Sequence, residues 1–187
     1  MNFRTMLFAS ISVSLLSITA TYGEELTKQD YLALPAKSLK NFQCAILIQN
    51  IGTAINPSAS SFLLSTSFTQ KAYDLGKQYY EALESNKISV MDLTLDMPSE
   101  FKLDTVAIMA RDPQEVIAFK LGRISVKATA DLLYKVGAVN DEGEVDTSKF
   151  RQKSPELLDE YCDFEGLNMP APMLEKLQQD LKSSIHE

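Results

Sequence analysis

One stretch, Asp112 to Val136, constrains the fold more than any other because it carries the start and stop signals of a long helix. Asp112 is a candidate N-cap, Pro113 suits the first helical position, and Glu115 lies three residues after the cap. Gly137 follows, and glycine is the residue that most easily takes the left-handed conformation beyond a helix C-terminus. The sequence therefore predicts one long helix here.

The predicted helix is apolar on most of its circumference. At about 100° per residue the side chains sort into faces. One face holds Ile117, Leu121, Ile124, Ala128 and Leu132, the opposite face holds Phe119, Val126, Ala130 and Leu133, and a stripe of short side chains between them holds Ala118, Gly122, Ser125 and Thr129. A helix of this kind is expected to be buried among other helices, and the short side chains are expected to admit one neighbour closely.

Four further segments show helical patterns. They are Pro35–Ile51, which Gly52 is expected to stop; Ser58–Asn86; a helix opening at Ser154-Pro155-Glu156; and Pro170–Ile185. Within the first, Cys44–Ile48 is apolar enough to be a strand, but we favour the helix. Within the second, Lys77 and Glu81 are spaced to pair at i,i+4.

Two regions are harder to interpret. Residues 88–110 alternate in part as a strand does, but their phase slips, and we favour short helices because an isolated strand has no evident partner. Residues 138–147 form an acidic, turn-forming loop that allows a small hairpin. Together the segments predict an all-α bundle of about five or six helices around the central buried helix, Asp112 to Val136.

The first residues resemble a secretory signal peptide. Met1–Arg4 is a short positive region, residues 5–20 are apolar, and small residues precede a predicted cleavage after Gly23 or Ala20. The alternative is an uncleaved anchor or the first helix of the fold. We expect residues 1–23 to be removed and residues 24–187 to form a single soluble helical domain, periplasmic or secreted, because no second segment approaches a membrane span.

Removal of that segment changes the formal net charge from −7 to −8, since it takes away Arg4 and no acid. Such a balance disfavours nucleic acid or an anionic membrane surface as the main partner.

The chain has two cysteines, Cys44 and Cys162. In an oxidising compartment an even pair predicts a disulfide, and closing a loop of this length restricts the unfolded chain by about 4–5 kcal/mol. Buried free thiols are the alternative. We expect no metal at the pair, because His186 is the only histidine and lies near the end of the sequence.

Catalytic and cofactor motifs receive little support. The acidic loop offers oxygen ligands for calcium, but with Gly143 as the sixth position an EF-hand would begin at Ala138 and end at Lys149, so a solvated loop is favoured. A single histidine leaves no nucleophilic triad, and Ser99–Lys102 matches S-x-x-K without its companion motifs. We expect no cofactor, no metal and no catalytic residue.

Five residues are candidates for ligand or partner binding: Lys120, Arg123, Lys127, Tyr73 and Tyr80. The three basic residues form a ridge on the predicted central helix, which is able to meet an acidic partner, an anionic ligand, or acids of a neighbouring helix. Of these, we favour pairing within the protein, or solvation of the ridge. Tyr73 and Tyr80 lie toward the edge of the apolar face of an aromatic-rich helix. Aromatic residues with a polar group are enriched at interfaces and ligand grooves, but the helical spacing favours packing in the core.

These features favour a binding function. We expect a small exported helical protein that binds a protein partner or a small ligand, and we favour a non-enzymatic role because no catalytic constellation is recognisable. Two alternatives stay open: a small cell-envelope enzyme that uses carboxylates and tyrosines, and a structural subunit of an envelope assembly.

Overall fold

The computed structural model describes residues 26–55, 59–93, 97–103, 113–164, 166–167 and 169–185. The predicted all-α fold is confirmed, with six α-helices and one 3-10 turn in these ranges. In chain order they are α1 (Lys28–Ile55), α2 (Ala59–Glu84), η1 (Val90–Asp92), α3 (Ser99–Leu103), α4 (Pro113–Lys135), α5 (Thr147–Tyr161) and α6 (Ala171–Ile185).

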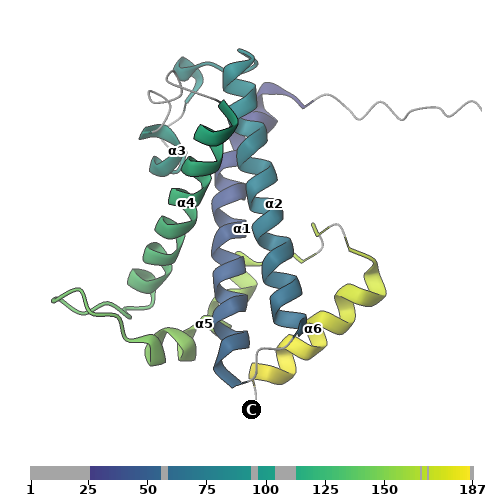
Figure 1. Cartoon of the computed structure of the whole chain (residues 1–187), viewed down its shortest axis with the longest axis vertical. Coiled ribbons are helices and arrows are strands. Elements are labelled where there is room, and N and C mark those ends of the chain that lie inside the picture. The colour runs from purple at the N-terminus through teal and green to yellow at the C-terminus, as the bar shows by residue number, and fades with distance from the viewer. Residues whose placement is uncertain are drawn as a thin grey trace, which may run out of the picture.

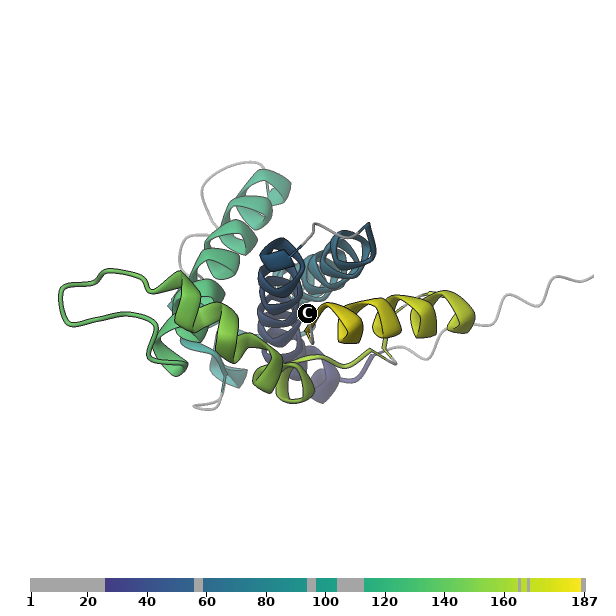
Figure 2. The same ribbon diagram turned by 90° about the horizontal axis from the view of Figure 1, so that it is seen from below.

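The helices are arranged around α1 and α2, which lie side by side at the centre of the molecule (Figure 1). α4 lies on one side of this pair and α6 crosses its opposite side, as the view from below also shows (Figure 2). α1 packs against α2, α4, α5 and α6, so it is the central helix. The prediction that the helix over residues 112–136 is central is therefore wrong.

α4 is buried on one face only. The first predicted face is confirmed, since Ile117, Leu121, Ile124, Ala128 and Leu132 are each at most 1% exposed. The opposite face is covered only in part: Phe119 is 67% exposed and Val126 is 71% exposed, whereas Ala130 and Leu133 are half-buried. A Cβ atom added at Gly122 would meet nothing within 4 Å, so the stripe of short side chains admits no close neighbour there. Apolar periodicity gives the faces of a helix but not whether a second face is covered.

A close approach between helices occurs at Gly76 of α2 instead. This glycine is buried, and a Cβ atom at its position would lie 2.3 Å from Leu121 Cδ2 and 3.0 Å from Ser38 Oγ. The Ser38 hydroxyl also donates a hydrogen bond of 2.7 Å to the carbonyl of Ala72. The missing side chain thus lets α1, α2 and α4 meet at one point.

α1 begins earlier than predicted and passes through Pro35 and Gly52. Thr27 caps it, because its hydroxyl accepts a bond from the Asp30 N–H while the Asp30 carboxylate accepts one from the Thr27 N–H, at 3.2 and 2.9 Å. Pro35 is the eighth residue of α1, where it removes the bond to the carbonyl of Tyr31 and its ring crowds that carbonyl. Burial of α1 among its neighbours outweighs the local cost of both residues.

α2 follows its predicted pattern closely. Leu64, Phe68, Ala72 and Tyr79 are fully buried, and the predicted Lys77–Glu81 ion pair is present at 3.7 Å. Asn86 ends the helix as expected: its φ is 57°, and the next N–H, that of Lys87, donates to the carbonyl of Ala82 at 2.9 Å. The predicted N-cap, Ser58, lies outside the described residues.

The segment after α2 contains short helical turns, as favoured over a strand. η1 and α3 occupy its described parts, while residues 94–96 and 104–110 lie outside them. The Lys28 ammonium binds Asp92 of η1 at 2.6 Å, which ties this segment to the start of α1.

The part of the chain after α4 begins with the left-handed Gly137, with φ 64°, and a small hairpin closed by a bridge between Val139 and Val145. α5 then starts at Thr147 rather than at Ser154, because Asp146 caps it by accepting a bond from the Lys149 N–H at 2.9 Å. α6 is found as predicted.

The core consists of two clusters along the α1–α2 pair. We call the first the disulfide cluster, formed by Cys44, Ala45, Leu47, Ile48, Ile51, Leu64, Phe68, Leu132, Ala138, Phe150, Leu158, Leu167, Leu177 and Leu181. We call the second the aromatic cluster, formed by Leu34, Phe42, Ala72, Tyr79, Tyr80, Ala82, Ile88, Met97, Phe101, Ile117, Leu121, Ile124 and Ala128. The predicted disulfide between Cys44 and Cys162 is confirmed, with Cα atoms 5.1 Å apart.

Several predictions fall outside the described residues, namely the signal segment 1–23, the cap at Asp112 and His186. Among the helices that the structure describes, none is both long and apolar enough to cross a membrane.

Candidate functional site

The predicted basic ridge of α4 does not form on the surface, because Lys120 points into the protein. Its side chain is 2% exposed, and its ammonium lies 5.0 Å from the centroid of the Tyr80 ring. A cation over an aromatic face is attracted by the ring quadrupole, more strongly where water is excluded. Lys120 and Tyr80, two of the predicted binding residues, are thus brought together, but inside the core.

Lys127 and Arg123 are both exposed on α4. The Lys127 ammonium binds Asp131 of its own helix at 2.6 Å and Glu100 of α3 at 3.2 Å. The hydrogen bond to Asp131, followed by that to Glu100, raises the pKa of Lys127. Of the alternatives for the basic residues, pairing with acids of the protein itself is therefore realised at Lys127.

The tyrosines of α2 pack in the aromatic cluster. The Tyr79 ring lies 5.2 Å from Tyr80 and 5.6 Å from Phe101, edge-on to both. Burial raises the pKa of Tyr79 to about 12, so this phenol stays protonated at neutral pH and is not suited to act as a base. Tyr73 is half-buried beside the same cluster. The packing interpretation holds for Tyr80, and Tyr73 remains the more accessible of the two.

The outward face of α4 carries the largest aligned set of exposed apolar side chains on this helix. Phe119, Val126 and Tyr134 are 67%, 71% and 67% exposed. Spaced seven and eight residues apart, they fall on one side of the helix and span about 22 Å along it. The sequence pattern identified Phe119 and Val126 as a face but placed it inside the fold, and it did not single out Tyr134.

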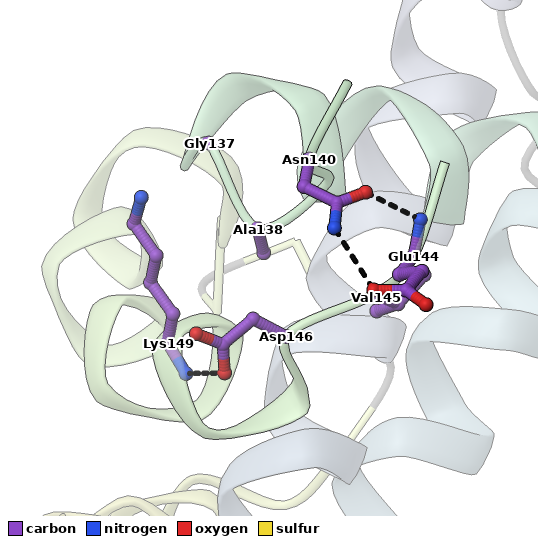
Figure 3. Close-up of a pocket in the computed structure, with 7 residues that line it drawn as sticks. All are labelled: Gly137, Ala138, Asn140, Glu144, Val145, Asp146 and Lys149. Carbon is purple, nitrogen blue, oxygen red and sulfur yellow. Dashed lines mark hydrogen bonds between the residues drawn. The ribbon is translucent and has the colours of Figure 1, made fainter. Parts of the chain in front are cut away.

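The acidic hairpin borders a polar hollow of roughly 350 Å³ (Figure 3). Its polar groups hold the loop together: Asn140 Oδ1 accepts from the Glu144 N–H at 2.7 Å, and the Asn140 amide donates to the Glu144 carboxylate at 3.0 Å. Asp146 caps α5, and hydrogen bonds from the Ser148 hydroxyl and then the Lys149 N–H lower its pKa. Within the described ranges no three acidic, histidine or cysteine side chains gather as a metal site. The hairpin is thus built as a loop and helix cap.

Comparison with models of protein families, with curated proteins and with solved structures gives no match. The function is therefore argued from the geometry of the chain itself.

Proposed function

We propose that this protein binds another protein through the outward face of α4. The observation that carries the proposal is the alignment of Phe119, Val126 and Tyr134 on one side of one helix, each about two-thirds exposed or more. Single exposed apolar residues are ordinary, whereas aligned ones mark interaction surfaces. Aromatic residues in particular are enriched in the energetically important centres of interfaces.

The surroundings of these side chains suit a flat or helical partner surface. Ala118 and Gly122 are exposed beside them, and the space at Gly122 is open, so a partner can approach the helix backbone there. Arg123 is exposed on the same side. The partner best suited to this face presents apolar side chains.

We further propose that binding takes place in the periplasm or outside the cell. The support is the sequence pattern of Met1–Gly23 together with the Cys44–Cys162 disulfide, a bond that persists in oxidising compartments.

The test is affinity capture from the native envelope fraction with the disulfide kept intact. Phe119→Ser/Val126→Ser replaces the apolar face without touching a buried side chain. Met91→Ser is the matched control, because Met91 is 93% exposed on η1. We expect one stoichiometric protein partner with the native chain and with Met91→Ser, and its loss with the double variant.

Two results would contradict the proposal. One is a partner retained by the double variant, which would place the contact elsewhere. The other is a native chain that captures no protein and stays monomeric at high concentration, which would favour a small ligand or an enzyme.

A further inference from the structure

The hairpin after α4, residues 138–146, stands at one end of the outward face of that helix. It starts directly from the last turn of α4, since the Ala138 N–H donates to the carbonyl of Leu133 at 2.8 Å and the Gly137 N–H donates to that of Tyr134 at 3.0 Å. Both views show the hairpin projecting away from α1 and α2, which is the side to which the outward face of α4 points (Figure 1, Figure 2). A partner that lies along this face therefore reaches the hairpin.

The hairpin concentrates negative charge at this end of the face. Asp141, Glu142 and Glu144 are exposed. The carboxylates of Asp141 and Glu142, at the tip, make no hydrogen bond or ion pair with a residue that the structure describes. Residues 138–149 hold four acids and one base, Lys149, so their formal net charge is −3. The offset by Lys149 at the base of the hairpin thus leaves the tip acidic.

The helical part of the face contributes little charge of its own. Glu115, one turn before Phe119, and Arg123 are both exposed and have opposite charges. Lys127, at the edge, is bound to acids of the protein itself. The charge that a partner meets along this face is therefore determined mainly by the hairpin.

This charge makes a second copy of the chain a poor occupant of the face. In an antiparallel pair of α4 helices, the hairpin of each copy lies against the first turn of the other α4, which carries Glu115. In a parallel pair the two hairpins lie together. Both arrangements bring like charges together, which is costly at an interface. An anionic membrane surface is disfavoured for the same reason, so the charge suits a partner that is basic where it meets the hairpin.

The shape of the face suits a helix. The space at Gly122 is open and Ala118 is exposed, so the backbone of a second helix can approach closely, as it does where helices pack 8–10 Å apart. The distance from Phe119 to Tyr134 along the helix, about 22 Å, corresponds to about 15 residues of a helical partner. An amphipathic helix presents its apolar side chains as a stripe of this length.

We propose that the partner bound by this face is a basic amphipathic helix of another protein, an inference that rests on the function proposed above. Its apolar stripe packs on Phe119, Val126 and Tyr134. Its lysine or arginine side chains, at one end of the stripe, bind the carboxylates of Asp141 and Glu142. The stripe provides most of the affinity, whereas the charges speed the encounter and determine the direction in which the helix docks.

The experiment uses two labelled synthetic helical peptides of about 20 residues and the full mature chain with its disulfide oxidised. Both peptides have the same stripe of leucines, but one has lysines in its first and last turns and the other has glutamates there. Stopped-flow fluorescence gives the association and dissociation rates at low and high salt. We expect the lysine peptide to bind at least about tenfold more tightly at low salt. The preference should shrink near 1 M salt, where charges are screened within about 3 Å.

A hairpin variant separates the local charge from the net charge of the protein. Asp141→Asn/Glu142→Gln should lower the association rate of the lysine peptide about three- to tenfold and leave its dissociation rate nearly unchanged, as expected for charges at the rim of an interface. Glu84→Gln/Glu175→Gln is the matched control, because it removes the same number of exposed carboxylates from α2 and α6. The control should leave both rates within about twofold of the native values.

A variant of the apolar face tests the other half of the contact. Phe119→Ser/Val126→Ser should raise the dissociation rate of both peptides at least about tenfold, because mutations at the centre of an interface act mainly on dissociation.

Four outcomes would overturn the inference: equal affinity for the two peptides at low salt, equal effects of the hairpin variant and its control, no binding of the lysine peptide up to about 1 mM, or full affinity in Phe119→Ser/Val126→Ser. The proposed function has its own readout in the envelope capture. If one of these outcomes occurs while the native chain still captures a partner that Phe119→Ser/Val126→Ser loses, the function stands and only the basic helix is excluded.

Discussion

The disulfide cluster and the aromatic cluster stabilise opposite halves of the same helix pair by different means. In the aromatic cluster the 23-residue α4 covers α1 and α2 with one continuous buried face, and Tyr79, Tyr80 and Phe101 fill the remaining space. In the disulfide cluster the covering helices, α5 and α6, have 15 residues each, and α6 buries few large side chains. Both clusters bury similar sets of side chains, so they differ in the elements that cover the helix pair. The comparison teaches that the covalent link stands where the cover consists of two short helices instead of one long one.

Among the changes considered, removing the disulfide should cause the largest loss of stability. Cys44 and Cys162 are 118 residues apart, so Cys44→Ser/Cys162→Ser should lower the free energy of unfolding by up to about 4–5 kcal/mol. Urea unfolding measures the loss. Amide hydrogen exchange should show α5 and α6 losing protection before α4 does. Uniform loss of protection in both clusters would show that the two halves do not differ as argued.

Gly76 marks a close helix–helix contact beside the aromatic cluster. Gly76→Ala places a methyl group against Leu121 and Ser38, and overpacking of this kind costs about 1–3 kcal/mol. Gly122→Ala is the matched control on α4, where the space is open and alanine should stabilise the helix by up to about 1 kcal/mol. Thermal and urea unfolding of both variants distinguish them. Equal effects of the two substitutions would mean that the contact at Gly76 relaxes freely.

The buried phenol of Tyr79 predicts a pH dependence of the aromatic cluster. Its pKa is about 12 in the folded protein against about 10 in the unfolded chain, so the unfolded state loses this proton first. The stabilisation contributed by the buried, protonated phenol is complete below pH 10 and is lost between about pH 10 and 12. Urea midpoints of the native chain should fall over this interval more steeply than those of Tyr79→Phe. Parallel curves would contradict the assignment to Tyr79.

The smallest effect is expected at the surface of α4. Lys127 is 50% exposed, and exposed ion pairs are worth about 0–1 kcal/mol. Lys127→Gln should therefore change the free energy of unfolding by less than about 1 kcal/mol, and by still less in high salt. A larger loss, measured by urea unfolding at two salt concentrations, would show that the link between α3 and α4 is part of the core.

Local patterns predicted the helices better than their places in the bundle. The all-α class, the disulfide and the buried face of α4 were predicted, because each depends on spacing or on residue type alone. The starts of α1 and α5 were missed because Pro35 and Pro155 suggested helix starts, although both lie inside the helices. Thr27 and Asp30, a capping pair three residues apart, are the signal that would have placed the first of them.

The candidate sites depend on contacts that the sequence does not display. Lys120 was expected on a surface ridge, yet helix α4 is turned so that its ammonium lies over the Tyr80 ring of α2. The Phe164 ring packs against Phe68 of α2, some ninety residues earlier in the chain, and no periodicity encodes that contact. Gly76 likewise shows nothing special until Leu121 lies against it.

The single cysteine pair also determines which wrongly bonded species can form during folding. α1 and α2 are neighbours in sequence and can pair early, whereas Cys162 becomes available only after most of the chain has been made. Because the chain has two cysteines, only one intramolecular pairing exists and no reshuffling of wrong bridges is needed. Before Cys162 is available, Cys44 can form a disulfide only with another molecule. Oxidative folding of this protein should therefore depend on protein concentration rather than on a disulfide isomerase.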